Sequence, residues 1–237
     1  FDEGRVSFEY SIFKGHMSIA NLKGSEIVSL LSFRHCTFYN SVDLSGNKFT
    51  CVPDLTNTKL TNQISLDRLE CAASFDSEGN PDPLDIERLC RLKELAAANK
   101  NHNQALRFHV QEMRAKRQQL DNTKSGQVFY FLDYLFDITS EYGRSTSKPA
   151  KWLIRAFYSY SIIYWIIGFV QKMEQGVIKS FGNGLLYALS QILPFTASGK
   201  VAATESAKQL FASADIPNWF FALSLSQGLV SFIFIFL

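Results

Sequence analysis

The apolar positions of the chain are gathered toward its C-terminal end. Two segments, 152–170 and 219–237, are apolar almost throughout, and each approaches the roughly 20 residues that a helix needs to cross a bilayer. The first carries a single charge, Arg155, and the second carries none. Between them, 183–196 is too apolar for a surface loop, too short to cross a membrane, and ends near a proline. This pattern predicts a membrane module over 147–237, with two transmembrane helices that hold a short re-entrant helix.

The layout of this module resembles that of two-helix pore-loop channels, in which the re-entrant segment lines the pore. The filter of potassium channels is a loop of the Thr-Val-Gly-Tyr-Gly type, and the corresponding stretch here reads LPFTASG. The resemblance therefore implies a pore helix without potassium selectivity. Its candidate lining residues are Tyr187, Ser190, Gln191, Pro194, Phe195 and Thr196.

The predicted second span carries a narrow stripe of polar and small residues at steps of three and four. The stripe consists of Ser224, Gln227, Gly228 and Ser231. Small residues let helices approach closely, and hydroxyls or amides hydrogen-bond between them, so the stripe indicates helix packing; the alternative is a polar path through the membrane. Gln227 is its most informative member, because an amide at this depth needs a partner.

Large apolar residues recur through residues 6–70 at a spacing that fits neither a helix nor a strand. Successive gaps alternate between five and six residues, and Ser, Thr, Asn, Asp and Gly lie between them, as turns require. One large apolar residue per short step is typical of solenoids, which stack such residues inward. The anchors of this spacing are Leu22, Ile27, Phe33, Phe38, Leu44, Phe49, Leu55, Leu60 and Leu66.

Stretches such as SVDLSGNKF and VPDLTNTKL resemble the pentapeptide-repeat proteins, whose unit centres on a Leu or Phe. The resemblance implies a right-handed quadrilateral β-helix over 1–78, with a degenerate repeat because Leu31, Val42 and Ile64 replace the small residue of the unit. The whole order of repeats, the hairpin RLKELAAANKNHNQALRFHVQEM, an EYGRS elbow and two spans resembles bacterial membrane-anchored pentapeptide-repeat proteins. The expected fold class is therefore mixed: a β-solenoid, then a helical hairpin, an interfacial helix and the membrane module.

The helical hairpin, which also serves as a cap, is predicted over 79–126. Asp82 suits the N-cap of its first helix, and Pro83 suits the first helical position. The end of its second helix is basic, which favours a helix C-terminus or contact with anionic lipid. The basic residues there are Arg114, Lys116 and Arg117.

Residues 127–146 are apolar on nearly every side except for three carboxylates, Asp133, Asp137 and Glu141, spaced i, i+4, i+8. A wide apolar face with a narrow polar stripe predicts an amphipathic helix that lies in the membrane interface. The alternative is a core helix of the soluble part. The simpler interpretation of the three carboxylates is that they are solvated. The more specific hypothesis is that they line a cation vestibule.

The composition of the chain argues against several classes of function. The 237 residues are 46% hydrophobic and carry a net charge of +2, which is too small to indicate a nucleic-acid partner. The cysteines, Cys36, Cys51, Cys71 and Cys90, lack metal-binding spacing and are expected to be buried free thiols in a reducing compartment. No metal site, cofactor motif or catalytic constellation is recognisable, so no enzyme activity is expected.

Basic residues cluster before the first predicted span, and the positive-inside rule then places the N-terminal parts in the cytoplasm. These residues are Arg144, Lys148, Lys151 and Arg155. The expected location is the inner (cytoplasmic) membrane, as a multi-pass protein in contact with the lipid bilayer. The chain is also expected to be a fragment, since Phe1 begins in mid-pattern and the last apolar run still continues at Leu237.

Two functions fit these features. The first is a channel-like or pore-forming homo-oligomer, with a tetramer as the candidate assembly, because two helices per chain cannot enclose a pore. The second is a non-conducting membrane-anchored scaffold or sensor, whose repeat domain binds a cytoplasmic protein partner. A simple anchor needs neither a re-entrant segment nor a polar stripe, so the first hypothesis is preferred.

Overall fold

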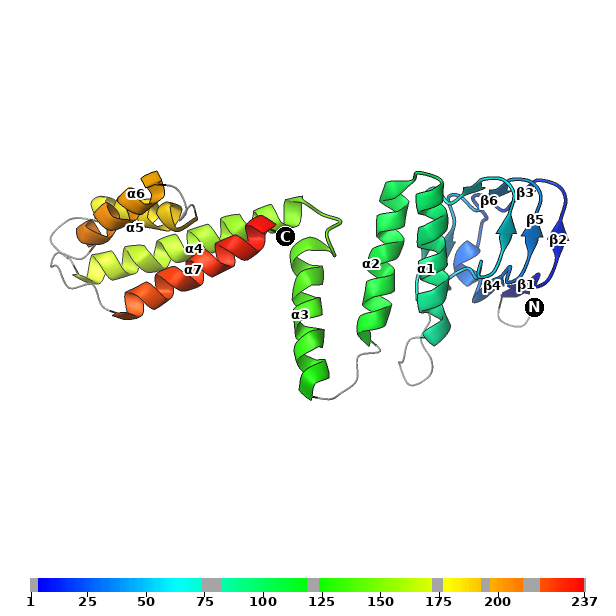
Figure 1. The fold of residues 1–237 in the computed structure, drawn as a ribbon, viewed down its shortest axis with the longest axis horizontal. Coiled ribbons are helices and arrows are strands. Elements are labelled where there is room, and N and C mark those ends of the chain that lie inside the picture. Colours follow the sequence, from blue (N-terminus) through cyan, green and yellow to red (C-terminus); the bar gives the residue numbers. More distant parts are fainter. Residues whose placement is uncertain are drawn as a thin grey trace. The chain divides into compact units, whose positions relative to one another are not determined.

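The computed structural model describes residues 4–73, 82–118, 124–171, 177–192, 197–210 and 218–236. The chain forms two compact units, Phe1–Asp137 and Ile138–Leu237, whose elements are labelled in Figure 1. Strands and the first helices make up the N-terminal unit, and helices make up the C-terminal unit.

Short parallel strands make up the first part of the N-terminal unit. They are β1 (Arg5–Ser7), β2 (Ile12–Phe13), β3 (Met17–Ser18), β4 (Leu30–Ser32), β5 (Thr37–Phe38), β6 (Val42–Asp43), β7 (Lys48–Phe49), β8 (Lys59–Leu60), β9 (Ile64–Ser65) and β10 (Glu70–Cys71). They pair in four small sheets, β1–β4, β2–β5–β8, β3–β6–β9 and β10–β7. A 3-10 helix, η1 (Ser25–Ile27), lies between β3 and β4. The register aligns apolar residues across a sheet, as where Phe13 pairs with Phe38 and Phe38 with Leu60.

Most of the predicted anchors fill the core of this unit. The following are at most 3% exposed: Phe33, Phe38, Leu44, Phe49, Leu55 and Leu66. Leu60 is partly buried against the same core. Leu22 and Ile27 differ, since they are 44% and 73% exposed. The alternating spacing therefore identified the core, but two of its first positions are not covered.

The predicted fold class, with a β-helix solenoid over 1–78, is wrong. Helices of 14 to 25 residues dominate the described part of the chain, and the strands form small separate sheets that neither close nor build a solenoid β-helix. The backbone explains the difference, because left-handed residues at His35, Gly46, Asn57 and Arg68, each eleven residues after the one before, interrupt the extended conformation between the short strands. Strands of two or three residues carry few ladder hydrogen bonds, so the anchors supply a core without supplying a continuous sheet.

A helical hairpin covers one end of the strand core. It consists of α1 (Pro83–Ala98) and α2 (His102–Gln118). Asp82 caps α1 by accepting a hydrogen bond from the Leu84 amide, with Pro83 in the first turn, as the sequence predicts. Leu89 and Leu92 of α1 are fully buried in the same cluster as the strand anchors. The hairpin and the strands thus share one core.

A buried arginine joins this hairpin to the strands. The Arg88 guanidinium on α1 lies 3.3 Å from Asp54 of the strand region, 2.8 Å from Asp85 and 3.0 Å from Asp82. The Arg88 side chain is 10% exposed and that of Asp85 is fully buried. Burial alone would lower the pKa of Arg88, but Asp85, Asp54 and Asp82 together raise it above its ordinary value. The ion pairs therefore hold a charge that the core could not otherwise accept.

The C-terminal unit is a helical bundle. Its helices are α4 (Ser147–Gln171), α5 (Val177–Ile192), α6 (Ala197–Leu210) and α7 (Asn218–Phe236), and they follow α3 (Lys124–Ser140), which crosses the boundary between the units. The ring of Trp152 stacks on that of Phe234, and the Tyr160 hydroxyl lies 3.0 Å from Ser226 Oγ. These pairs show that α4 and α7 are antiparallel (Figure 1). The core of the bundle contains Tyr164, Tyr187, Ala188, Ala207, Leu210 and Phe220.

Two helices are long and apolar enough to cross a membrane. They cover Ser147–Val170 and Trp219–Phe236, and only 17% and 22% of their most apolar stretches are buried. Their exposed side chains include Ile154 and Ile166 on α4 and Leu225 on α7, each more than half exposed. Such a surface is unfavourable in water and suits lipid.

Loss of the buried arginine is expected to destabilise the N-terminal unit. In Arg88→Met, Asp54 and Asp85 stay buried without their cation, which costs about 3–5 kcal/mol. Amide hydrogen exchange of β4 to β9 in the full chain should then accelerate on the order of 10²–10³-fold. Arg107→Met, which removes an exposed arginine of α2, serves as the control and should leave exchange unchanged. Equal exchange in both variants would show that the Arg88 network is not needed.

Candidate functional site

The helices α4 and α5 approach each other closely beside the polar centre of the C-terminal unit. A Cβ at Gly184 of α5 would lie 2.8 Å from the Trp165 backbone nitrogen and 3.2 Å from the Ser161 carbonyl oxygen of α4. No side chain fits there, so glycine lets the two backbones touch. The contact positions the next turn of α5, with Tyr187 and Ala188, where α7 can reach it.

Tyr187, Ser224 and Gln227, together with the carbonyl of Ala188, form the polar cluster of this unit. The Tyr187 hydroxyl lies 2.6 Å from Ser224 Oγ, and Gln227 Nε2 donates to the Ala188 carbonyl oxygen at 2.8 Å. Because Ser224 Oγ also donates to the Phe220 carbonyl oxygen, the Tyr187 hydroxyl is the donor to Ser224. These hydrogen bonds link α5 and α7 inside an apolar bundle.

The polar cluster is closed to solvent. Tyr187 is 4% exposed and Gln227 is 1% exposed. The ring of Tyr187 packs against Tyr164 and Phe220, with centroids 4.7 Å and 4.9 Å apart. Two polar atoms here stay unsatisfied: Gln227 Oε1 and the Tyr164 hydroxyl have no hydrogen-bond partner within the described ranges.

The remaining residues of the predicted stripe and pore helix lie around this cluster. Ser231 is 2% exposed, and Ser190 is buried and donates to the Tyr187 carbonyl oxygen at 2.6 Å within its own helix. Gly228 and Gln191 are half-buried. Pro194, Phe195 and Thr196 lie outside the described residues. The structure thus brings Tyr187 together with Ser224 and Gln227, a pairing that the sequence did not predict.

The stripe on α7 faces the helices of its own chain. Ser224, Gln227 and Ser231 are all at most 8% exposed, and Ser224 and Gln227 form hydrogen bonds with α5 and within α7 itself. The opposite side of α7 is apolar and open, with Leu225 67% and Leu229 57% exposed. Within one chain the stripe therefore serves helix packing, and the surface left for neighbours is apolar.

Each carboxylate of the predicted acidic stripe has a basic partner. Asp137 accepts hydrogen bonds from Arg114 at 2.8 Å and 3.0 Å and from Arg117 at 3.0 Å. Asp133 pairs with Arg117 at 3.7 Å, and Glu141 lies 2.5 Å from Lys148 Nζ. Burial alone would raise the pKa of Asp137, but the hydrogen bonds from both arginines hold it below its ordinary value.

Those pairs also account for the basic end of α2. Arg114 and Arg117 contact α3, and Lys116 lies 2.5 Å from Glu112 of its own helix. The Arg117 guanidinium further lies over the rings of Tyr130 and Tyr134, at 5.9 Å and 5.5 Å. Arg114 and Arg117 at the end of α2 therefore pair with α3, a contact that the sequence did not predict.

The helix α3 also carries large apolar side chains that are well exposed in the single chain. Its large apolar side chains are between 37% and 61% exposed: Val128, Phe129, Tyr130, Phe131, Leu132, Tyr134, Leu135 and Phe136. A core helix of a soluble unit would bury most of them. In the single chain α3 is therefore more exposed than a core helix of a soluble unit.

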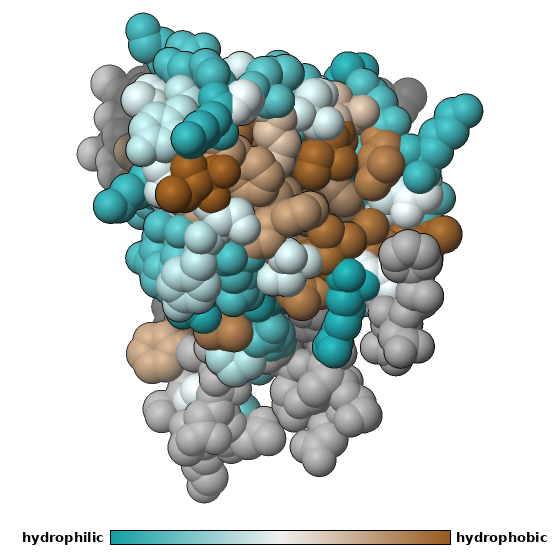
Figure 2. Space-filling view, turned by 90° about the vertical axis from the view of Figure 1, so that its right-hand side faces the viewer, coloured by the Kyte–Doolittle hydropathy of each residue, from teal (hydrophilic) through white to brown (hydrophobic). Residues whose placement is uncertain are grey.

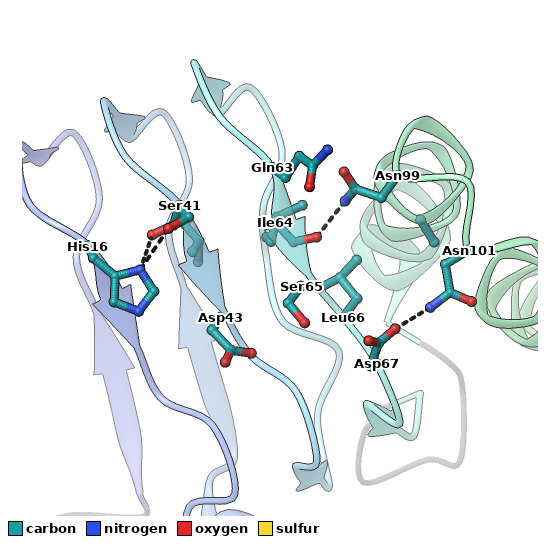
Figure 3. A pocket seen from close by; sticks show the side chains of 12 residues that line it. His16, Ser41, Asp43, Gln63, Ile64, Ser65, Leu66, Asp67, Asn99 and Asn101 are labelled. Carbon is teal, nitrogen blue, oxygen red and sulfur yellow. Dashed lines mark hydrogen bonds between the residues drawn. The ribbon is translucent and has the colours of Figure 1, made fainter.

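The N-terminal unit holds a polar pocket of about 370 Å³ where β3, β6 and β9 meet the turn between α1 and α2. Figure 3 shows its polar side chains turned toward one another. His16 Nδ1 lies 2.8 Å from Ser41 Oγ, Asn99 donates to the Ile64 carbonyl oxygen, and Asn101 donates to Asp67. No pattern in the sequence indicates this pocket, because its residues come from segments far apart in the chain.

Nucleophilic or metal chemistry finds little support in the described part of the chain. Cys36, Cys51 and Cys71 are buried free thiols, and Cys90 is half-buried. Burial is the main factor that raises the pKa of Cys71 to about 12, where a thiol is a poor nucleophile. The described residues contain no group of three or more His, Cys, Asp or Glu that could hold a metal ion.

Comparisons with protein-family models, curated proteins and solved structures found no match.

A methyl group at the helix contact is expected to loosen the C-terminal unit. In Gly184→Ala the new Cβ meets the α4 backbone, and overpacking of this kind costs about 1–3 kcal/mol. Gly182→Ala is the matched control on the same helix, because no atom lies within 4 Å of its Cβ. Thermal unfolding of the purified chain in detergent should place Gly184→Ala several degrees below wild type and Gly182→Ala at or above it. Equal midpoints for the two variants would contradict the close approach.

Removal of the Asp137 charge should release α3 from α2. In Asp137→Asn, Arg114 and Arg117 lose their charged acceptor, a contribution of about 1.5–3 kcal/mol, so amides of α3 should exchange at least tenfold faster. Asp133→Asn, with a longer pair and a more exposed carboxylate, should have a smaller effect.

The same contact should depend on pH in a defined direction. Because the folded pKa of Asp137 is lowered, its stabilisation is complete above the unfolded value of about 3.9 and is lost as pH falls through the folded value. Protection of α3 should therefore be constant from neutral pH down to about 5 and weaken only in stronger acid. Loss of amide protection in α3 near neutral pH would contradict the lowered pKa of Asp137.

Proposed function

We propose that the protein is a multi-pass protein of the inner (cytoplasmic) membrane that acts as a non-conducting scaffold or sensor, with the N-terminal unit in the cytoplasm. The observation that carries this proposal is the burial of the polar stripe on α7 against α5 of the same chain. The groups that would line a conducting path are used to hold the bundle together.

The membrane location follows from the two long apolar helices. The two helices are antiparallel. If they cross the bilayer, the start of α4 and the end of α7 therefore emerge on the same side. The start of α4 carries Lys148, Lys151 and Arg155, and the positive-inside rule makes that side cytoplasmic. The Arg155 guanidinium lies 5.2 Å from the Trp152 ring, and such a pair suits the interface between lipid and water.

The helix α3 supports the same placement. It presents apolar and aromatic side chains on its open face and binds Arg114 and Arg117 on the other. A helix of this kind lies in the plane of the interface. The resemblance to bacterial membrane-anchored pentapeptide-repeat proteins adds support through the order of segments, and its β-helix is not part of the proposal.

Conduction by this arrangement would require an oligomer whose pore is lined by α7 or α5. The side chains that these helices leave open are chiefly apolar, such as Leu186, Leu189 and Leu229. An apolar constriction excludes water and ions by dewetting. A scaffold or sensor needs only the anchor and a partner-binding surface, for which the N-terminal unit offers the polar pocket beside Asp43 and Asp67.

The channel-like homo-oligomer is the second candidate, and one observation favours it. Gln227 Oε1 is buried without a hydrogen-bond partner in the described ranges. An unsatisfied amide oxygen in an apolar bundle costs about 1–3 kcal/mol, and such strain is retained where a group has a role. A second chain or a permeating species would satisfy it.

Ion flux through liposomes separates the two functions. Purified full chain of known oligomeric state is reconstituted, and flux is compared with protein-free liposomes. The scaffold predicts no flux above background for wild type or for Gln227→Leu. Flux in wild type that Gln227→Leu alone abolishes would overturn the scaffold and establish the channel.

The scaffold role has its own test in cells. Deletion of residues 1–126 leaves the membrane helices in place, so membrane insertion should persist while the cellular effect of the protein is lost. A deletion that inserts and keeps the full effect would show that the N-terminal unit is dispensable.

A further inference from the structure

The centre of the C-terminal unit holds two polar atoms that bulk water does not reach. Hydrophilic side chains at a surface are solvated directly, as they are around the end of the N-terminal unit seen in Figure 2. Tyr164 of α4 is instead fully buried, and Gln227 of α7 is 1% exposed. The Tyr164 hydroxyl and Gln227 Oε1 have no hydrogen-bond partner within the described ranges. Because a buried polar atom without a partner carries the full cost of its lost hydration, a ligand that pairs with both would stabilise the bundle.

Both atoms belong to the polar cluster around Tyr187. The rings of Tyr164 and Tyr187 are nearly perpendicular, with centroids 4.7 Å apart, and Tyr164 also lies beside Ser224. Ser224 Oγ in turn contacts the Tyr187 hydroxyl at 2.6 Å. Gln227 follows one turn later on α7, and its Nε2 donates to the Ala188 carbonyl oxygen. That bond holds the amide inside the bundle, so Gln227 Oε1 is held there as well.

We propose that this cluster binds ordered internal water, which accepts a hydrogen bond from the Tyr164 hydroxyl and donates one to Gln227 Oε1. A phenol hydroxyl can donate and an amide oxygen can only accept, and water can do both at once. Buried water makes about two to four hydrogen bonds of this kind and is costly to remove. The site lies in the interior of one chain, so the inference goes beyond the proposed function and does not depend on it.

Water fits these atoms better than other ligands do. A second copy of the chain could reach Tyr164 and Gln227 only by opening the bundle, since both are at most 1% exposed. A divalent cation prefers carboxylate ligands, whereas the groups of this cluster are neutral. An apolar molecule would leave both polar atoms unpaired. Space for a small ligand exists next to Gln227, because a Cβ at the half-buried Gly228 would meet no atom within 4 Å.

Radiolytic hydroxyl-radical footprinting of the full chain in detergent tests for this water, because radicals form from bound water as well as from bulk water. Tyr164 should be hydroxylated although it is fully buried. Phe108, an aromatic residue of the N-terminal core with 1% exposure, is the control and should stay unmodified. In Gln227→Leu the water loses its acceptor, so hydroxylation of Tyr164 should fall to the level of Phe108.

Two outcomes of the footprinting would overturn the proposal. One is a Tyr164 ring that is as unreactive as Phe108 in the wild-type chain. The other is equal or greater hydroxylation of Tyr164 in Gln227→Leu, with circular dichroism showing that the variant is folded, because access would then come from opening of the bundle.

Thermal unfolding supplies an independent arm whose sign is decisive. If water is bound, Tyr164→Phe removes a hydrogen bond and should lower the midpoint by about 2–4 °C. Without water, the same change removes an unpaired polar atom from an apolar core, and the midpoint should rise. Tyr158→Phe, which alters a tyrosine that is 57% exposed on the same helix, is the matched control and should leave the midpoint unchanged. A midpoint for Tyr164→Phe at or above that of wild type would also overturn the proposal.

Discussion

One constraint governs both units: a polar group withdrawn from water must find its partner inside the chain. In the N-terminal unit this applies to Arg88, whose charge is held by Asp54 and Asp85 in the shared core of strands and α1. In the C-terminal unit it applies to the Tyr187 hydroxyl and the Gln227 amide, which bind Ser224 and Ala188. The Arg88–Asp54 pair and the contacts of Tyr187 with Ser224 and of Gln227 with Ala188 join segments far apart in the sequence. Because leaving one partner alone costs several kcal/mol, these pairs select which elements become neighbours, while the apolar contacts around them supply most of the stability.

The same constraint decides how the polar stripe on α7 is interpreted. A stripe of serine and glutamine on an otherwise apolar helix serves either a pore or a neighbouring helix. Here Gly184 brings the α5 backbone against α4, and that approach presents Tyr187 and Ala188 to Ser224 and Gln227. The polar stripe therefore forms its contacts within one chain. What α4 and α7 offer to their surroundings is apolar, which suits a lipid-facing anchor better than the wall of an aqueous path.

The sequence predicted individual elements better than it predicted their partners. The two long apolar runs, the Asp82 cap and most of the buried anchors could be recognised, because each depends on local pattern alone. The β-helix was wrong because anchor spacing reports which residues point inward and says little about how far a strand extends between left-handed residues. The pairing of Asp137 with Arg114 and Arg117 was missed for another reason: the carboxylate and its arginines lie on different helices, and no periodicity links them. The polar pocket escaped notice in the same way, since His16, Asp67 and Asn99 meet only after folding.

The helix α3 shows how two requirements can be met by a single surface. Its carboxylates need cations, which Arg114 and Arg117 provide, and its apolar side chains, many of them well exposed in the single chain, favour an apolar environment. Water satisfies only the first requirement and a protein core only the second, because burying the whole helix would also desolvate the ion pairs. The membrane interface satisfies both, with acyl chains against the apolar face and headgroups near the arginines. Tyr130 and Tyr134, beside the Arg117 guanidinium, have the mixed character that this boundary favours. The charge pairs that fasten α3 to α2 thus also set the depth at which the helix can lie in the proposed arrangement.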